Sequence, residues 1–272
     1  MSIASVGTIL CPVDLSEQSQ AALYHAAGFA QAPGSRLIVL RVDPRALAGH
    51  EDDALAARQE LDEFVRGTLP GWLGYSSRTE LAVRGGDPVA TILAVAREFS
   101  ADLLVMGTRG RGALARALLG STAAAVLRES HVPVAVIPPS RPEIISLGES
   151  RAIFHFGLIL VPLDLRDPAT RQLEWAVRLS GGSDHKLLLV HVASDAARRE
   201  RAAGELNALA SGLESAHGAK LLVREGPVAD EIVHLVRHER AGLVVMGRSP
   251  DAPGATAYEV LRNTNALVLM VP

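Results

Sequence analysis

An internal repeat limits this 272-residue chain to a small set of folds. Three pairs of apolar segments recur in the same order in its two halves, the first two pairs at an offset of 150 and the third at an offset of 140. The pairs are Ile9–Leu15 with Leu158–Leu165, Arg36–Val42 with Lys186–Val192, and Ala101–Gly107 with Ala241–Gly247. Collinear echoes of this length indicate the duplication of a domain-sized unit.

Residues 140–151 separate the two copies and are rich in proline and polar residues. We therefore predict a linker there, between a first domain of residues 1–139 and a second of residues 152–272.

Within each copy, short apolar runs alternate with runs of helical period. The strands predicted in the first copy are Thr8–Val13, Arg36–Val42, Thr79–Arg84, Asp102–Met106 and Val132–Ile137. The helices predicted between them are Glu17–Gln31, with Ser16 as N-cap, then Ala46–Leu69, Val89–Phe99 and Ala123–Glu129. Strands that alternate with helices favour an α/β fold, here two tandem doubly wound domains, each a five-stranded parallel sheet flanked by helices.

Composition narrows the class of protein further. Apolar residues make up 48% of the chain and aromatic residues only 4%, which suits helices packed on parallel strands of Leu, Val, Ala and Ile. A net charge of −3 gives no excess of basic residues of the kind that proteins use to bind nucleic acid. Cys11 is the single cysteine, and no apolar run reaches 18 residues. We expect a cytoplasmic protein that binds neither nucleic acid nor membrane.

A glycine-rich loop follows the fourth predicted strand. Gly107, Gly110 and Gly120 are separated by two and nine residues, and Ser121 and Thr122 follow at the start of a helix. Glycines let the backbone approach an anion, and a helix N-terminus presents unpaired N–H groups to it. Either hydroxyl is a candidate helix cap. The loop therefore indicates a phosphate cradle, although a plain turn explains the glycines as well.

Two familiar phosphate motifs are absent from this loop. Residues 1–139 contain no lysine, so no P-loop lysine is available, and G-x-G-x-x-G fails at Ala115. Arg109 and Arg111 either reach phosphate groups or face solvent.

The glycine spacing, closing a strand–loop–helix unit, resembles the ATP-binding loop of the universal stress protein family. Together with the repeat, the resemblance covers nearly the whole chain as two tandem domains of the adenine nucleotide alpha hydrolase-like fold. It implies that Asp14 contacts adenosine, that Pro12 and Val13 line the same edge, and that the backbone of Val42 meets adenine. It also implies a ribose–phosphate loop, formed by Met106, Gly107, Gly110, Gly120, Ser121 and Thr122. Asp14 is also a candidate N-terminal cap for the helix that follows it, and the two readings are compatible.

The second copy departs from this pattern. Asp164 and Val192 stand at the adenine positions, but only six residues separate Gly247 from Gly254, and they include Pro250, Pro253 and Asp251. Proline lacks an N–H donor and an acidic side chain repels phosphate, so ATP binding there is doubtful.

Three functions remain open. The first is a regulatory stress-response protein that holds one ATP, or another adenine nucleotide, with Mg²⁺ in the first domain. The second is a weak ATPase or phosphotransferase, for which the sequence offers no clear metal-holding carboxylate or catalytic base, so we assign no catalytic or metal-binding residue. The third is a nucleotide-free interaction scaffold.

We also expect the two domains to pair within the chain as a pseudo-dimer. Each copy ends in an apolar strand, Val132–Ile137 or Ala266–Val271, and such edges are usually covered. A homodimer and an unidentified protein partner are further expectations.

Overall fold

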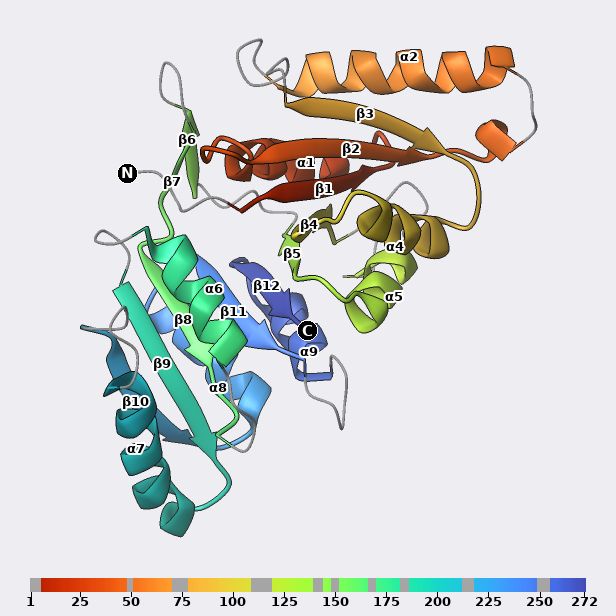
Figure 1. Cartoon of the computed structure of the whole chain (residues 1–272). Helices are drawn as coiled ribbons and strands as arrows, with labels where there is room; N and C mark the ends of the chain where they lie inside the picture. The colour runs from red at the N-terminus through yellow and green to blue at the C-terminus, as the bar shows by residue number, and fades with distance from the viewer. Residues whose placement is uncertain are drawn as a thin grey trace. The chain divides into compact units, whose positions relative to one another are not determined.

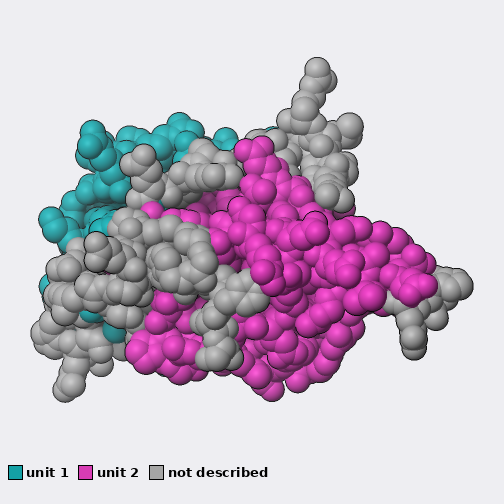
Figure 2. Space-filling view, turned by 90° about the horizontal axis from the view of Figure 1, so that it is seen from above, with its two compact units in different colours: residues 1–4, 142–144, 154–272 teal, residues 5–141, 145–153 magenta. Residues whose placement is uncertain are grey.

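The computed structural model describes residues 6–47, 51–69, 78–108, 119–138, 144–147, 152–165, 170–181, 186–211, 218–248 and 255–272. The chain divides into two compact units. Figure 2 colours the first, residues 5–141 and 145–153, magenta, and the second, residues 1–4, 142–144 and 154–272, teal. We call them the N-terminal unit and the C-terminal unit.

The N-terminal unit is a parallel five-stranded sheet in the order β3-β2-β1-β4-β5 (Figure 1). Its strands are β1 (Thr8–Val13), β2 (Arg36–Val42), β3 (Thr79–Arg84), β4 (Leu103–Gly107) and β5 (Val134–Ile137). Its helices are α1 (Glu17–Phe29), the 3₁₀ turn η1 (Pro44–Leu47), α2 (Glu51–Thr68), α4 (Pro88–Glu98) and α5 (Ser121–Glu129).

Helices cover both faces of this sheet. The α1 helix packs on β1 and β4 and also touches α2, whereas α4 and α5 pack against each other, as Figure 1 shows. The first three residues of β4, Leu103, Leu104 and Val105, are at most 1% exposed, because side chains on both faces of the strand are covered. The predicted doubly wound fold is confirmed.

The C-terminal unit repeats this architecture in the order β10-β9-β8-β11-β12. Its strands are β8 (Leu158–Pro162), β9 (Lys186–Ala193), β10 (Lys220–Glu225), β11 (Leu243–Gly247) and β12 (Leu267–Val271). Its helices are α6 (Thr170–Ser180), α7 (Ala196–Ser211), α8 (Val228–His238) and α9 (Ala255–Asn263). Each unit thus places its first strand beside its fourth, as a duplicated sequence requires.

Local signals located most element boundaries of the N-terminal unit to within two residues. The predicted limits of β1, β2 and β3 are correct at both ends, and Ser16 is the N-cap of α1, where its hydroxyl accepts from the N–H of Ser19. The predicted strand at Val132 instead begins at Val134, because Pro133 has no N–H to contribute to the sheet.

Two stretches differ from the expectation. The single helix predicted over Ala46–Leu69 is wrong at its start, since the 3₁₀ turn η1 precedes α2. The predicted linker contains β6 (Ile145–Leu147), which pairs with β7 (Ala152–Phe154) in a separate two-stranded sheet.

Candidate functional site

The candidate site lies at the carboxyl ends of β1 and β4, the neighbours at which the strand order reverses. Their register pairs Ile9 with Leu103 and Leu10 with Leu104 and goes no further. Pro12, two residues on, has no N–H with which to extend the ladder. The strands therefore part at the switch point, the place where open α/β sheets hold ligands.

Most of the predicted site residues come together at this edge. Pro12, Val13 and Asp14 end β1 or follow it, Val42 ends the neighbouring β2, and Met106 and Gly107 end β4. Arg109 and Gly110 lie outside the described residues, as does Arg111.

Gly107 has a steric reason to be glycine. A Cβ atom there would lie 3.1 Å from the backbone oxygen and 3.3 Å from the Cβ of Gln18, in the first turn of α1. The end of β4 thus packs directly against the beginning of α1.

The N-terminus of α5 is held at the end of β4. The Gly120 N–H donates to the carbonyl of Thr108 at 2.6 Å and so closes the glycine-rich loop. Gly120 itself is the N-cap, so the prediction that Ser121 or Thr122 caps the helix is wrong. Because both hydroxyls lie in the first turn and not at the cap, they stand beside N–H groups that have no acceptor within the helix. The first turn carries no acidic residue to oppose an anion.

Asp14 is held by the start of α1. Its Oδ1 accepts from the N–H of Ser16 at 3.1 Å, from the Ser16 hydroxyl at 2.6 Å and from the Ser19 hydroxyl. Ser19 also accepts from the Asp14 N–H at 3.0 Å. Ser16 is the actual cap, so the reading of Asp14 as the N-cap is wrong, although its carboxylate does orient the capping residue.

A partly buried ion network lies beside Val42, in which Arg41 and Asp43 are buried and Arg45 and Glu60 are partly exposed. Arg41 Nη2 is 2.7 Å from Asp43 Oδ2 and 2.8 Å from Glu60 Oε2, while Arg45 contacts both carboxylates at 2.8–3.1 Å. Hydrogen bonds from Arg45 lower the pKa of Asp43 to about 2, and hydrogen bonds from Arg45 and then Arg41 lower the pKa of Glu60 to about 2. The network ties the end of β2 to α2 and so sets the position of the Val42 backbone.

Sequence reasoning missed this network and the role of Ser19. Alternation of charge in Arg41, Asp43 and Arg45 was a signal for the network, but the fourth member, Glu60, is distant in sequence. Ser19 gave no signal, because any serine in a first helical turn has the same appearance.

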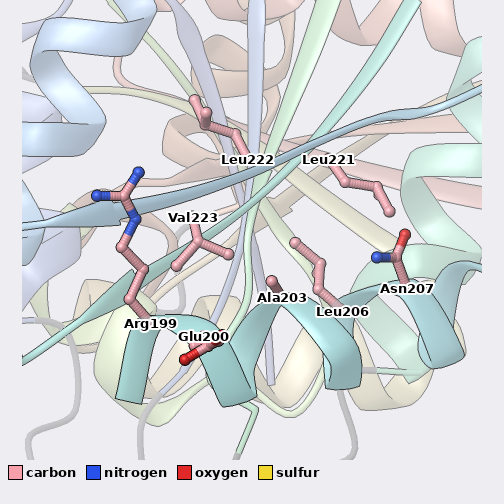
Figure 3. A pocket seen from close by; sticks show the side chains of 8 residues that line it. All are labelled: Arg199, Glu200, Ala203, Leu206, Asn207, Leu221, Leu222 and Val223. Atoms are coloured by element: carbon pink, nitrogen blue, oxygen red, sulfur yellow. The ribbon is translucent and has the colours of Figure 1, made fainter. Parts of the chain in front are cut away.

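Two observations bear on other sites. Within the described ranges, no three His, Cys, Asp or Glu side chains gather as a metal-ligand set. An open groove of about 670 Å³ lies on the C-terminal unit between α7 and β10 (Figure 3). It is lined by apolar side chains such as Leu206 and Val223, with Arg199 and Glu200 near the N-terminal end of α7. The described residues that line it belong to α7 and β10, and none comes from the ends of β8 or β11.

No helix in the described part of the chain combines the length and apolar character that a bilayer crossing requires.

The family model described as "Universal stress protein family" matches residues 6–138 and again residues 155–272. A universal stress protein of Thermus aquaticus is 35% identical over 134 residues, covering 48% of this chain and 97% of that protein. A Synechocystis universal stress protein is 31% identical over 133 residues, covering 48% of this chain and 85% of that protein. The crystal structure of an Archaeoglobus fulgidus universal stress protein matches 98% of this chain and 96% of its own, with a TM-score of 0.71 and 23% identity, a likeness of fold.

Proposed function

The chain belongs to the universal stress protein family, and we propose that its N-terminal unit holds one adenine nucleotide, ATP in the first instance, and acts by its occupied state and not by turnover. The observation that carries this proposal is the closure of the glycine-rich loop by the Gly120–Thr108 hydrogen bond. That bond holds the first turn of α5 next to the end of β4, and Asp14 directly follows the neighbouring strand β1.

The donor set fits the charge of a nucleotide. Backbone N–H groups and the partial positive charge of the α5 N-terminus suit phosphate, and the hydroxyls of Ser121 and Thr122 add donors. The Asp14 carboxylate suits the hydroxyl and amino donors of adenosine. Mg²⁺ would supply the positive charge that lysine supplies in P-loop proteins, since residues 1–139 have no lysine.

Retention fits these residues better than catalysis. In-line phosphoryl transfer requires a group that orients the attacking water and carboxylates that hold the metal. Of the two carboxylates that directly follow β1 and β2, Asp14 is bonded through Oδ1 to Ser16 and Ser19, and Asp43 is paired with Arg41 and Arg45. The proposal is therefore a regulatory protein whose bound nucleotide is read by a partner protein.

Calorimetric titration of the full chain with Mg-ATP tests the proposal. We expect about one site per chain and loss of binding in Gly120→Val. The backbone of Gly120, with φ of −70° and ψ of 154°, is one that valine adopts without strain, so the variant should fold. Gly254→Val, at the glycine that follows Gly247 in the C-terminal copy, is the matched control and should bind as wild type does.

Three results would contradict parts of the proposal. Wild-type affinity in Gly120→Val would show that the N-terminus of α5 does not bind the phosphates. Two sites per chain would remove the restriction to one unit. Hydrolysis at roughly 1–100 per second, as in kinases, would establish an enzyme instead.

A further inference from the structure

The C-terminal unit fills its own switch point with a side chain. There β8 and β11 are the neighbours at which the order reverses, and their register pairs Ile159 with Leu243 and Leu160 with Val244. Beyond these pairs, the amide of Gln172 lies between the two strand ends. With the amide turned to satisfy both neighbours, its nitrogen donates to the Pro162 carbonyl at 3.1 Å and its oxygen accepts from the Gly247 N–H at 2.8 Å.

The fit at Gly247 is close. A Cβ atom on Gly247 would overlap the terminal amide of Gln172, so glycine is needed at this position for the amide to enter. The adjacent Arg248 N–H donates in the opposite direction, to Val271 on β12 at 2.9 Å. The Gly247 N–H therefore faces the gap toward β8, where Gln172 takes it.

Among the described residues of the N-terminal unit, no side-chain amide bridges the ends of β1 and β4 in this way. The offset of 150 between the two copies aligns Gln172 with Ala22, which is fully buried and carries no polar group. A Cβ atom on Gly107 would meet the backbone and Cβ of Gln18 instead of a side-chain amide. The two units thus share the parted strands and differ in what lies between them.

A ligand hydroxyl matches the bonding of this amide. Gln172 accepts one hydrogen bond and donates another, and a ribose hydroxyl does both with a single oxygen. We propose that Gln172 is a built-in ligand that closes a nucleoside site in the C-terminal unit, and that shortening it opens this unit to adenosine. This inference rests on the proposed function of the N-terminal unit for the identity of the ligand.

The expected ligand is the nucleoside and not the triphosphate. Asp164 and Val192 stand at the ends of the strands that correspond to β1 and β2, as Asp14 and Val42 do in the N-terminal unit. The sequence between Gly247 and Gly254 is short and contains two prolines, which lowers the number of N–H donors available to phosphates.

The test measures adenosine binding to full-length variants in a background where Asp14→Ala removes the proposed adenosine contact of the N-terminal unit and Gly120→Val its phosphate cradle. We expect Gln172→Ala in this background to bind about one adenosine per chain, at least roughly tenfold more tightly than the background alone. Gln172→Met in the same background is the matched control. Methionine fills the gap without hydrogen bonds, so this variant should bind adenosine as weakly as the background alone.

The proposal is overturned if adenosine binds Gln172→Ala no better than the background, or binds Gln172→Met equally well. If Gln172→Ala does not fold, Gln172→Ser is titrated in its place and judged by the same comparison. Mg-ATP binding to the wild-type chain reports separately on the N-terminal unit, so failure of the proposed function there is distinguishable from failure of this inference.

Discussion

Ser19 and Asp14 are joined by a reciprocal pair of hydrogen bonds: the Asp14 N–H donates to Ser19 Oγ at 3.0 Å, and the Ser19 hydroxyl donates to Asp14 Oδ1. Ser19 is 6% exposed, so these bonds are shielded from water. The pair helps to hold the Asp14 carboxylate, which in the proposed site faces adenosine. It also ties the end of β1 to the first turn of α1.

Replacing Ser19 should therefore weaken nucleotide binding, although Ser19 itself is not proposed to contact the nucleotide. Ser19→Ala removes one of the three hydrogen bonds to Asp14 Oδ1 and leaves the two from Ser16. The loss of one oriented hydrogen bond corresponds to roughly a threefold to tenfold rise in Kd for Mg-ATP. Ser19→Thr retains the hydroxyl and should restore most of the affinity. Calorimetric titration measures both variants, and an unchanged Kd in Ser19→Ala would show that the pair only caps the helix.

Ser130→Ala is the control for a general loss of stability. Ser130 donates to the Val132 carbonyl at 2.7 Å, just before β5 and thus at the opposite edge of the sheet. The variant should lower the melting temperature by a similar amount and leave the Kd as it is in the wild type.

Adding one methyl group at Gly107 should damage the site, because its Cβ would lie 3.1 Å from the backbone oxygen of Gln18. Relief of this contact requires α1 or the end of β4 to move, at a cost of about 1–3 kcal/mol of folding free energy. Gly107→Ala should also weaken nucleotide binding. The matched control is Gly67→Ala in α2, where no atom lies within 4 Å and alanine should stabilise the helix by about 1 kcal/mol. Urea unfolding gives both values; equal effects would refute the packing argument.

Acid should destabilise the fold through Asp43 and Glu60. Both have pKa values near 2 in the folded protein, below the value of about 4 for an unpaired carboxyl group. The unfolded chain therefore takes up protons first. The stabilisation is complete above about pH 4.5 and is lost as the pH falls toward 2.

Asp43→Asn tests this source of stability. The variant should lose about 1.5–3 kcal/mol at pH 7, since it removes the ion pair with the buried Arg41 and the charged hydrogen bonds from Arg45. Its stability should also fall less steeply between about pH 4.5 and 2. Glu98→Gln breaks an exposed pair with Arg84 and should cost less than about 1 kcal/mol. Urea unfolding at pH 7 and pH 3 measures the difference. An unaltered pH profile in Asp43→Asn would mean that other carboxyl groups control acid unfolding.

Cys11 should be inert in the native protein. Its side chain is fully buried in β1, and this burial raises the pKa of the thiol, so the thiolate that reacts with electrophiles is scarce. We expect disulfide reagents to label it only after unfolding. Because the folded pKa is raised, stability from the protonated thiol is complete below about pH 8.5 and declines as the pH rises above it. Cys11→Ala should lack this alkaline decline, and rapid labelling of native wild type would contradict the burial.

Much of the fold was accessible from local pattern. Apolar runs such as Thr8–Val13 and Arg36–Val42 are strands because a parallel sheet buries both faces, and nothing outside the run is needed to recognise that. The collinear echoes then predicted a second unit of the same order. Ser16 was recognised as a cap because capping depends on a few neighbouring residues.

By itself, then, the sequence determined the repeat, the alternation of strands and helices, and which residues lie at the edge where β1 and β4 part. Tertiary structure alone decided which side chains meet at the strand ends of the two units. Glu60 reaches Arg41 and Arg45 from another element, and Gln172 enters the gap between Pro162 and Gly247. Such contacts depend on how a helix is rotated over a sheet, which is set by the packing of many residues at once and leaves no periodic mark in the sequence.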